Sequence, residues 1–158
     1  MPIYMKYDGI PGDVTEEGHK SWIELNSCQW GIGRGISSPT GGSADRESSA
    51  PSVSEVTITK AQDVATIKLV DAALQGEGKL VEIDFTKTDK GKLEVYLKLT
   101  LTNTMISGYS LSSGGDRPSE SLSLNFTKVE VKMLQNDSTG AGADSSNVTY
   151  DISSAKVV

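Results

Sequence analysis

Apolar and polar residues alternate along much of the chain, a pattern typical of β-strands with one buried face. The alternation is longest at 93–101 and returns at 81–85, and the turn 88–92 between the two runs contains Gly91. The two runs therefore predict an antiparallel hairpin with one face toward a core and the other toward water. Their apolar positions are Val81, Ile83, Phe85, Leu93, Val95, Leu97, Leu99 and Leu101.

Shorter runs predict further strands, so strands dominate the expected fold. They lie at 3–7, 22–32 and 53–59, with a short final strand at 148–152. The composition agrees, because 21 Ser, 13 Thr and 16 Gly residues suit strands with wet faces and many turns. We therefore expect a mainly β protein and not a helical bundle.

The segment 122–133 changes phase within one expected strand. Its first three apolar residues occupy even-numbered positions and its next three occupy odd-numbered positions, so they would point to opposite sides of one strand. They are Leu122, Leu124 and Phe126, followed by Val129, Val131 and Met133. A register slip would expose one of the two sets to water. Either a bulge near Thr127 and Lys128 re-aims the strand, or the strand is covered on both faces, one of them by a partner molecule.

One amphipathic helix is expected after Asp63, which can cap it, and Gly76 or Gly78 would end it. Apolar residues recur at helical spacing and predict the face that packs against the strands. A short helix of this kind can close one side of a barrel or sandwich. The residues of the expected packing face are Ile67, Val70, Ala73 and Leu74.

Two segments predict loops, and both belong to one domain that covers 1–158. The first, 37–52, reads SSPTGGSADRESSAPS and has no hydrophobic residue larger than Ala. A structureless loop of this length is uncommon in a compact domain and is usually functional or disordered. The second, 136–147, is similar and is expected to be a flexible segment.

Length and charge exclude several classes of protein. The 158 residues fit a single domain with its own core. The net charge of −6 argues against a nucleic-acid partner, which would require a surplus of Lys and Arg. No stretch reaches the ~20 apolar residues of a membrane span. The N-terminus lacks a secretory signal, so we expect cytoplasmic synthesis and, if the protein is exported, export without a cleavable signal peptide.

Candidate catalytic chemistry is sparse. Cys28 is the single cysteine, which excludes an internal disulfide. His19, the single histidine, could be a general base or could pair with Cys28; the alternative is a solvated histidine at the entry of a strand. A nucleophilic pair also needs an orienting group and an oxyanion site, and no residue is singled out for either. We therefore assign no catalytic residue and no metal ligand, and expect no enzyme activity.

Two other features could bind small molecules. The run 31–35, GIGRG, resembles a phosphate cradle only superficially, because Pro39 and its neighbours do not start a helix after it. We interpret it as a flexible exit from a strand and assign no cofactor. Trp22 and Trp30 could stack on a sugar, or could anchor the core or an interface.

A longer motif at 113–131 reads SGGDRPSESLSLNFTKVEV and resembles the signature of the Hcp family. Hcp, the haemolysin-coregulated protein, forms the tube of bacterial type VI secretion. The order of further matches agrees: VSEVTITK at 53–60, and IYMKYDGIPG at 3–12 followed by the two tryptophans. The motif residues, which we expect at a subunit interface, are Asp116, Arg117, Glu120, Leu124, Asn125 and Phe126.

The resemblance implies a two-sheet antiparallel β-barrel with one short α-helix, a fold shared with phage tail-tube proteins. It also implies homo-hexameric rings that stack into a hollow tube, which a contracting sheath propels into a target cell. The expected partners are further rings, sheath and spike proteins and, in some members, small effector proteins held in the lumen. The protein would then be secreted.

The long loop is the expected ring-to-ring contact. Ordering it costs about 1–2 kcal/mol per residue for the backbone, so we expect stacking to be weak in solution and to need a scaffold. The alternative functions are a phage tail tube, a carbohydrate-binding β-sandwich and a hydrolase that uses His19 or Cys28. The expected ring-to-ring residues are Ser38, Pro39, Thr40, Asp45, Arg46 and Glu47.

Overall fold

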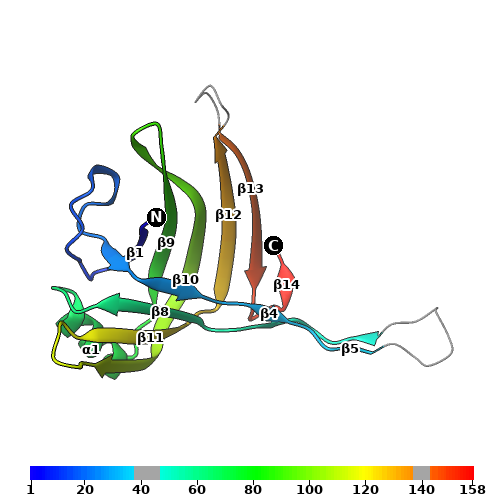
Figure 1. Ribbon diagram of the computed structural model, residues 1–158. Helices are drawn as coiled ribbons and strands as arrows, with labels where there is room; N and C mark the ends of the chain where they lie inside the picture. The colour runs from blue at the N-terminus through cyan, green and yellow to red at the C-terminus, as the bar shows by residue number, and fades with distance from the viewer. Residues whose placement is uncertain (38–46, 137–142) are drawn as a thin grey trace.

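The computed structural model describes residues 1–37, 47–136 and 143–158 (Figure 1). The residues 38–46 and 137–142 lie outside that description. Two antiparallel sheets share the long strand β10 (Lys92–Ser112) and pack around one core. The expected mainly β fold with antiparallel strands and one α-helix is confirmed for the part of the chain that the structure describes.

The large sheet has the strand order β2-β1-β9-β10-β12-β13-β14. The expected strand at the N-terminus and the expected hairpin are both present in it. Lys90 and Gly91 form the hairpin turn with φ angles of 51° and 78°, as a two-residue turn with two positive φ angles requires. The other strands of this sheet are β1 (Ile3–Tyr7), β2 (Ile23–Leu25), β9 (Lys79–Asp89), β12 (Lys128–Asn136), β13 (Ala143–Asp151) and β14 (Lys156–Val157).

The small sheet continues from β10 through β11 (Ser119–Asn125) and β8 (Val56–Ala61) to β3 (Ser27–Gln29). Strand β10 serves both sheets because its first half pairs with β9 and β12, and its second half pairs with β11. The apolar faces of the two sheets meet in the core. Its fully buried members include Ile58, Val81, Ile83, Leu99, Leu101 and Leu124.

The phase change in 122–133 has neither of the two expected causes. The chain leaves the small sheet at the end of β11 and enters the large sheet at Lys128, so two strands replace the one expected. Phe126 is buried at this corner, and the Thr127 backbone N–H donates to the Thr102 carbonyl at 3.1 Å. The side of the strand that faces the core in β11 is not the side that faces it in β12, because the two strands belong to different sheets. The apolar residues therefore move from one set of alternating positions to the other.

Helix α1 (Thr66–Gln75) forms where it was expected and ends at Gly76, which has a left-handed conformation. The expected packing face was right for Ala73, which packs against the core. It was wrong for Ile67 and Leu74, which are 77% and 83% exposed, and it left out Leu69, which is fully buried. The helix lies against β10 and the ends of β8 and β11 (Figure 1). Among the described residues, no helix is long and apolar enough to cross a membrane.

Both expected loops contain strands. In the first, β5 (Ile36–Ser37) pairs with β6 (Glu47–Ser48), next to β4 (Ile32–Gly33) paired with β7 (Ser52–Val53). These four strands form a two-stranded ribbon, which we call the arm, that projects from the body of the protomer (Figure 1). In the second, residues 143–147 belong to β13, which is longer than the short final strand expected.

Candidate functional site

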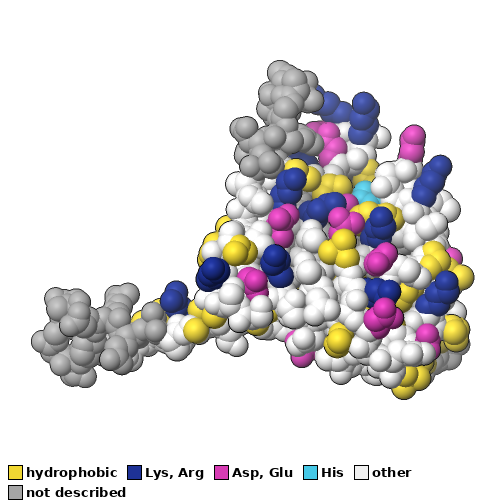
Figure 2. Space-filling view, turned by 180° about the vertical axis from the view of Figure 1, so that it is seen from behind, with side chains coloured by type: hydrophobic (Ala, Val, Ile, Leu, Met, Phe, Trp, Pro, Cys, Tyr) yellow, Lys and Arg dark blue, Asp and Glu magenta, His cyan; other side chains and the backbone are white. Residues whose placement is uncertain are grey.

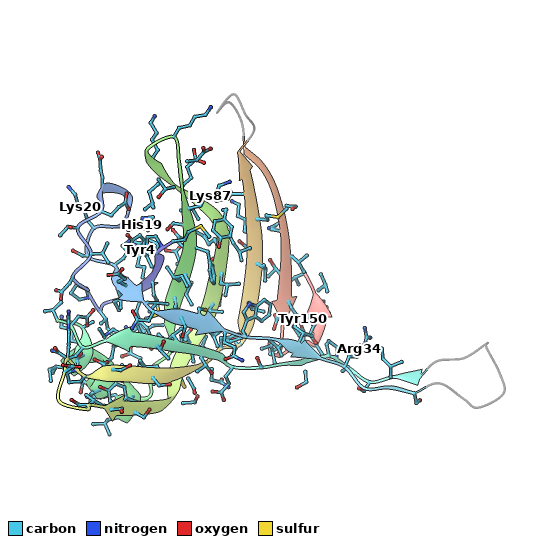
Figure 3. The ribbon with its side chains drawn as sticks, viewed as in Figure 1. Tyr4, His19, Lys20, Arg34, Lys87 and Tyr150 are labelled. Carbon is cyan, nitrogen blue, oxygen red and sulfur yellow. The ribbon has the colours of Figure 1, made fainter. Side chains whose placement is uncertain are left out.

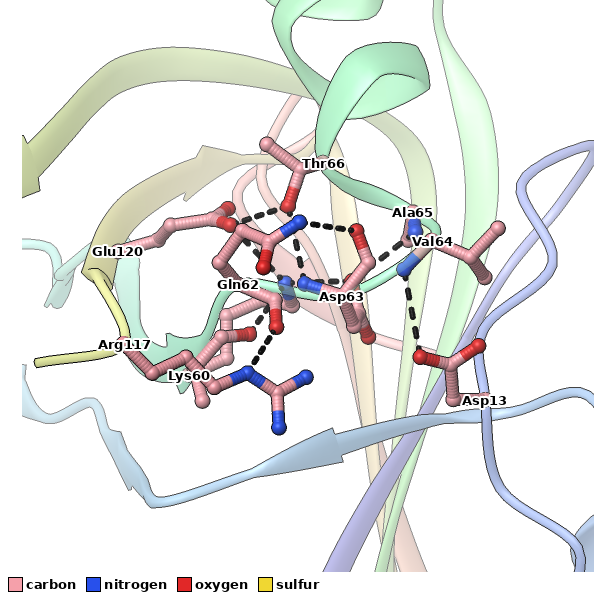
Figure 4. Close-up of polar contacts among 10 residues, drawn as sticks. Asp13, Lys60, Gln62, Asp63, Val64, Ala65, Thr66, Arg117 and Glu120 are labelled. Atoms are coloured by element: carbon pink, nitrogen blue, oxygen red, sulfur yellow. Dashed lines mark hydrogen bonds and ion pairs between the residues drawn. The ribbon is translucent and has the colours of Figure 1, made fainter.

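A buried polar cluster lies where β8, β11 and the start of α1 meet (Figure 4). Lys60, fully buried, forms ion pairs with Asp63 (Nζ–Oδ1 2.8 Å) and Glu120 (Nζ–Oε1 3.4 Å). Thr66 donates from its hydroxyl to Glu120. The cluster therefore connects two strands to the helix, and its two carboxylates stabilise the charge of the buried Lys60 ammonium.

The same residues fix the start and the rotation of α1. Asp63 is not the N-cap that was expected: the N-cap position is Ala65, which makes no side-chain cap hydrogen bond. Asp63 Oδ1 instead accepts a hydrogen bond from the Ala65 backbone N–H at 2.9 Å and so fixes the turn that leads into the helix. The Thr66–Glu120 hydrogen bond holds Thr66 against β11, which turns Leu69 inward and leaves Ile67 outward. This contact explains why the larger apolar residues face away from the core.

Sequence reasoning missed Lys60 and Thr66, although a signal for Lys60 was present. Lys60 continues the buried phase of Val56 and Ile58 on β8, and Glu120 continues the buried phase of β11. The two lie opposite each other in the register. In each of the two strands, a charged residue occupies one of the alternating positions that are otherwise apolar and buried. Two such residues of opposite charge could have predicted a buried ion pair.

The expected interface motif is divided between the interior and the surface of the protomer. Glu120, Leu124 and Phe126 are buried within a single protomer. Asp116, Arg117 and Asn125 are exposed. Three of the six residues thus serve the protomer core, and the remaining three are available for contacts with another chain.

Arg117 connects the motif to the helix entrance. Its Nε donates to the Gln62 carbonyl at 2.6 Å, and its guanidinium lines a hollow of about 200 Å³ (Figure 4). Asp13, Glu24 and Asp63 also line the hollow. The Arg117 hydrogen bond holds the turn before β11 against the segment before α1.

His19 is not the solvated histidine that the sequence suggested. Its ring is buried between two carboxylates, with Nδ1 2.5 Å from Glu16 Oε2 and Nε2 2.8 Å from Asp84 Oδ2. Each ring nitrogen thus has a carboxylate oxygen within hydrogen-bond distance, one from the loop that carries His19 and one from β9. The hydrogen bond from His19 and that from the Gly18 backbone N–H lower the pKa of Glu16.

The ring also packs between two aromatic residues. Its centroid lies 4.8 Å from that of Tyr4 and 4.6 Å from that of Trp22, which it meets edge-on. Figure 3 shows Tyr4 and His19 side by side on β1 and the neighbouring loop. His19 therefore anchors the loop that follows β1 to the outer face of the large sheet, where Lys, Arg, Asp and Glu side chains are interspersed (Figure 2).

The alternative pairing of His19 with Cys28 does not form, because the hydrogen-bond partners of His19 are Glu16 and Asp84. Burial against the core raises the pKa of the Cys28 thiol to about 11. A neutral thiol is a poor nucleophile. In residues 1–37, 47–136 and 143–158, no cluster of three His, Cys, Asp or Glu side chains could hold a metal ion.

The two tryptophans are both used inside the protomer. Trp30 packs against the core. Trp22 contacts His19, and the centroid of its ring lies 6.0 Å from Lys98 Nζ. The GIGRG run forms the first strand of the arm, where it was expected to be a flexible exit.

The large sheet carries an apolar face that extends beyond the core. Leu99 and Val131 lie opposite each other in the register, and Val131 lies opposite Val148. Leu99 is fully buried, whereas Val148 is 58% exposed and Met133, two residues from Val131, is 49% exposed. The start of β12 and the end of β13 are covered, since Val129 is buried and Tyr150 packs against the core. The core-facing side of the sheet is uncovered around Met133 on β12 and Val148 on β13, and we call this region the open face. Exposed apolar patches of this kind are typical of interaction sites.

Most of the expected ring-to-ring residues lie outside the described residues: Ser38, Pro39, Thr40, Asp45 and Arg46. Glu47 begins β6 at the far end of the described arm. The described base of the arm carries two exposed isoleucines, Ile32 and Ile36. An isolated two-stranded hairpin is marginally stable in water, so the arm needs a further surface against which to pack.

Solved structures with the same fold cover nearly the whole chain. A structure described as that of a type six secretion system protein has a TM-score of 0.88 and 26% identity, over 99% of both chains. Hcp1 from Salmonella typhimurium has a TM-score of 0.80 and 23% identity, over 99% of this chain and 98% of that one. A type VI secretion system effector from Yersinia pestis has a TM-score of 0.72 and 23% identity, over 94% and 98%.

No curated protein matches the chain. The sequence profile of the family described as "Type VI secretion system effector, Hcp" matches residues 4–133. This match includes the motif at 113–131, the segment 53–60 and all but the first residue of the segment 3–12. The chain therefore belongs to the Hcp family of type VI secretion system proteins.

Proposed function

We propose that this chain is a structural tube subunit of the type VI secretion apparatus, which assembles into homo-hexameric rings that stack into a hollow tube. Membership of the Hcp family supports a role in this tube. The single observation that carries the subunit role is the open face, where Met133 and Val148 are exposed on the side of the large sheet that elsewhere forms the core.

A ring of identical subunits needs two different surfaces that fit each other. The open face is one such surface, and the exposed motif residues Asp116, Arg117 and Asn125 belong to another part of the protomer. The open face lies on β12 and β13, whereas the motif lies at the opposite side of β10, around β11. This separation supports a head-to-tail contact, which can close into a ring.

The arm supports the second level of assembly. We propose that its far end, with Ser38, Pro39, Thr40, Asp45, Arg46 and Glu47, contacts the next ring. Because ordering such a segment costs about 1–2 kcal/mol per residue, stacking is weak in solution and is completed by the sheath. Sheath and spike proteins, and small effectors in the lumen, are the other proposed partners. The protein is secreted through this apparatus from the cytoplasm, and its role is structural and not catalytic.

Light scattering after size-exclusion chromatography tests the proposal directly. We expect a species of about six chain masses, and annular particles in negative-stain electron microscopy. Met133→Glu should leave the circular dichroism spectrum unchanged and shift the protein to a single chain, because it places a charge on the open face. Met133→Leu is the matched control and should retain the rings. A wild-type protein that stays a single chain at high concentration would contradict the proposal.

A further inference from the structure

The outer side of α1 carries an apolar stripe with an acidic centre. Ile67, Asp71 and Leu74 are spaced by four and three residues, so they share one face of the helix. All three are exposed, because the opposite face carries the buried Leu69. We call Ile67, Asp71 and Leu74 the helix stripe.

The base of the arm carries the same arrangement with the opposite charge. Ile32 begins β4, Ile36 begins β5 and Arg34 lies between the two strands, so the three follow one another at two-residue intervals along the first chain of the ribbon. In an extended chain this spacing places side chains on one side. Arg34 donates from Nε to the Ser49 carbonyl at 2.9 Å, which fixes the stem of its side chain on the arm (Figure 3). We call Ile32, Arg34 and Ile36 the arm stripe.

The dimensions of the two stripes agree. An extended strand rises about 3.3 Å per residue, so the two isoleucines of the arm lie about 13 Å apart with Arg34 midway. A helix rises about 1.5 Å per residue, so Ile67 and Leu74 lie about 10 Å apart with Asp71 between them. Each stripe therefore presents two apolar ends and one central charge, and the central charges are opposite.

The two stripes lie on different sides of one protomer and cannot meet within it. Helix α1 lies at the end of the small sheet that faces away from the arm (Figure 1). Within the described residues, neither Arg34 nor Asp71 forms an ion pair with another side chain. The complementary pattern is thus available to a second copy of the chain.

We propose that the arm stripe of one protomer docks on the helix stripe of its neighbour in the same ring, with Arg34 paired to Asp71 between the flanking apolar residues. The contact is heterologous, because each copy offers its arm to one neighbour and its helix to the other. It covers the exposed isoleucines of the arm and supplies the support that a two-stranded ribbon lacks. This inference rests on the proposed ring and names a pair of surfaces that holds it together.

Charge reversal tests the central pair. Arg34→Glu and Asp71→Arg each place like charges opposite one another, so each should raise the protein concentration needed for half-maximal ring assembly by at least about tenfold. The double variant Arg34→Glu/Asp71→Arg restores opposite charges and should assemble close to the wild-type concentration. Lys20→Glu, which reverses an exposed charge on the loop that follows β1, is the matched control and should not change assembly.

Disulfide trapping tests proximity independently of affinity. In a Cys28→Ala background, a chain with Arg34→Cys mixed with a chain with Asp71→Cys should form a mixed disulfide dimer under mild oxidation. A chain with both substitutions should give a ladder on a denaturing gel that stops at six chains. A ladder that continues beyond six would place the contact between rings and overturn the proposal, as would the absence of cross-links.

The two proposals fail in different ways. If the wild-type protein forms rings and both single charge reversals assemble normally, the arm–helix contact is wrong and the tube subunit stands. If the wild-type protein forms no rings, the proposed function itself is wrong. A double variant as poorly assembled as the single variants, with a normal circular dichroism spectrum, would also overturn the direct pairing of Arg34 with Asp71.

Discussion

Lys60 and Glu120 form an ion pair inside the protomer, with an Nζ–Oε1 distance of 3.4 Å and no exposed side-chain surface on either residue. Lys60 comes from β8 and Glu120 from β11, opposite each other in the register of the small sheet. Thr66, at the start of α1, donates to the same carboxylate. The pair therefore links the stability of the small sheet to the placement of the helix.

Glu120→Gln should lower the free energy of unfolding by about 3 kcal/mol, because it leaves the buried Lys60 with only one carboxylate partner. Urea unfolding followed by circular dichroism measures the change, at one protein concentration for all variants. Glu77→Gln is the matched control, because Glu77 pairs with Lys79 at the surface and should cost less than about 1 kcal/mol. Equal losses in the two variants would show that the buried pair has no special role.

Glu16 should make stability depend on pH in the acid range. Its pKa is lowered from the ordinary value of 4.5, chiefly by the hydrogen bond from His19. The folded state therefore binds fewer protons than the unfolded state, so this carboxylate stabilises the protein above its ordinary pKa and loses that effect as the pH falls through the lowered value.

The comparison of Glu16→Gln with wild type tests this sign. The melting temperature of the variant should be below that of wild type at pH 7, and the difference should shrink when both are measured at pH 3. Glu17→Gln removes a neighbouring exposed charge without a bond to His19 and serves as the control. A difference between Glu16→Gln and wild type that is unchanged at pH 3 would contradict the prediction.

Cys28 should react slowly with thiol reagents in the folded protein. Burial raises its thiol pKa from 9.0 to about 11, so the thiolate population near pH 8 should be about 100-fold lower than that of an unperturbed thiol. The rate of alkylation by iodoacetamide should rise with pH up to this value, and should rise sharply at pH 8 in denaturant. Fast alkylation of the native protein at pH 8 would show that the thiol is more accessible than the structure indicates.

Gly12 should tolerate no side chain. A Cβ atom at this position would lie 2.3 Å from the Trp22 carbonyl oxygen and 2.8 Å from the Ile23 Cα, both backbone atoms that cannot rotate away. Gly12→Ala should therefore lower the free energy of unfolding by about 1–3 kcal/mol, as forced overpacking does. Gly114→Ala meets no atom within 4 Å and should leave the urea midpoint unchanged. A Gly12→Ala variant as stable as Gly114→Ala would show that the loop moves freely.

Local pattern was sufficient for several elements. The alternation at 81–101 and the turn with Gly91 predicted the β9–β10 hairpin, because a strand pair joined by two residues depends on neighbours in the sequence. Asp63 and Gly76 likewise marked the start and end of α1. The family was also indicated by sequence, because its motif is a contiguous run.

Elements that depend on distant partners could not be predicted in this way. The phase change after Phe126 required knowledge that the chain changes sheets there. The rotation of α1 depends on the hydrogen bond from Thr66 to Glu120, 54 residues away, and periodicity alone selected Ile67 and Leu74 as the packed residues. The ribbon in 37–52 has no apolar alternation, because its strands pair with each other outside the core.

The order of polar and apolar residues by itself determined that this chain forms antiparallel strands, one short helix and a family-specific turn before β11. The spacing of apolar residues in strands and helices depends on residues that are close in the sequence, so it can be recognised before the fold is known. The folded protein was needed to show that Lys60 faces Glu120, that His19 lies between two carboxylates and that an apolar part of the large sheet is left uncovered. These relationships join residues far apart in the chain, and their energies exist only when packing removes water from between them.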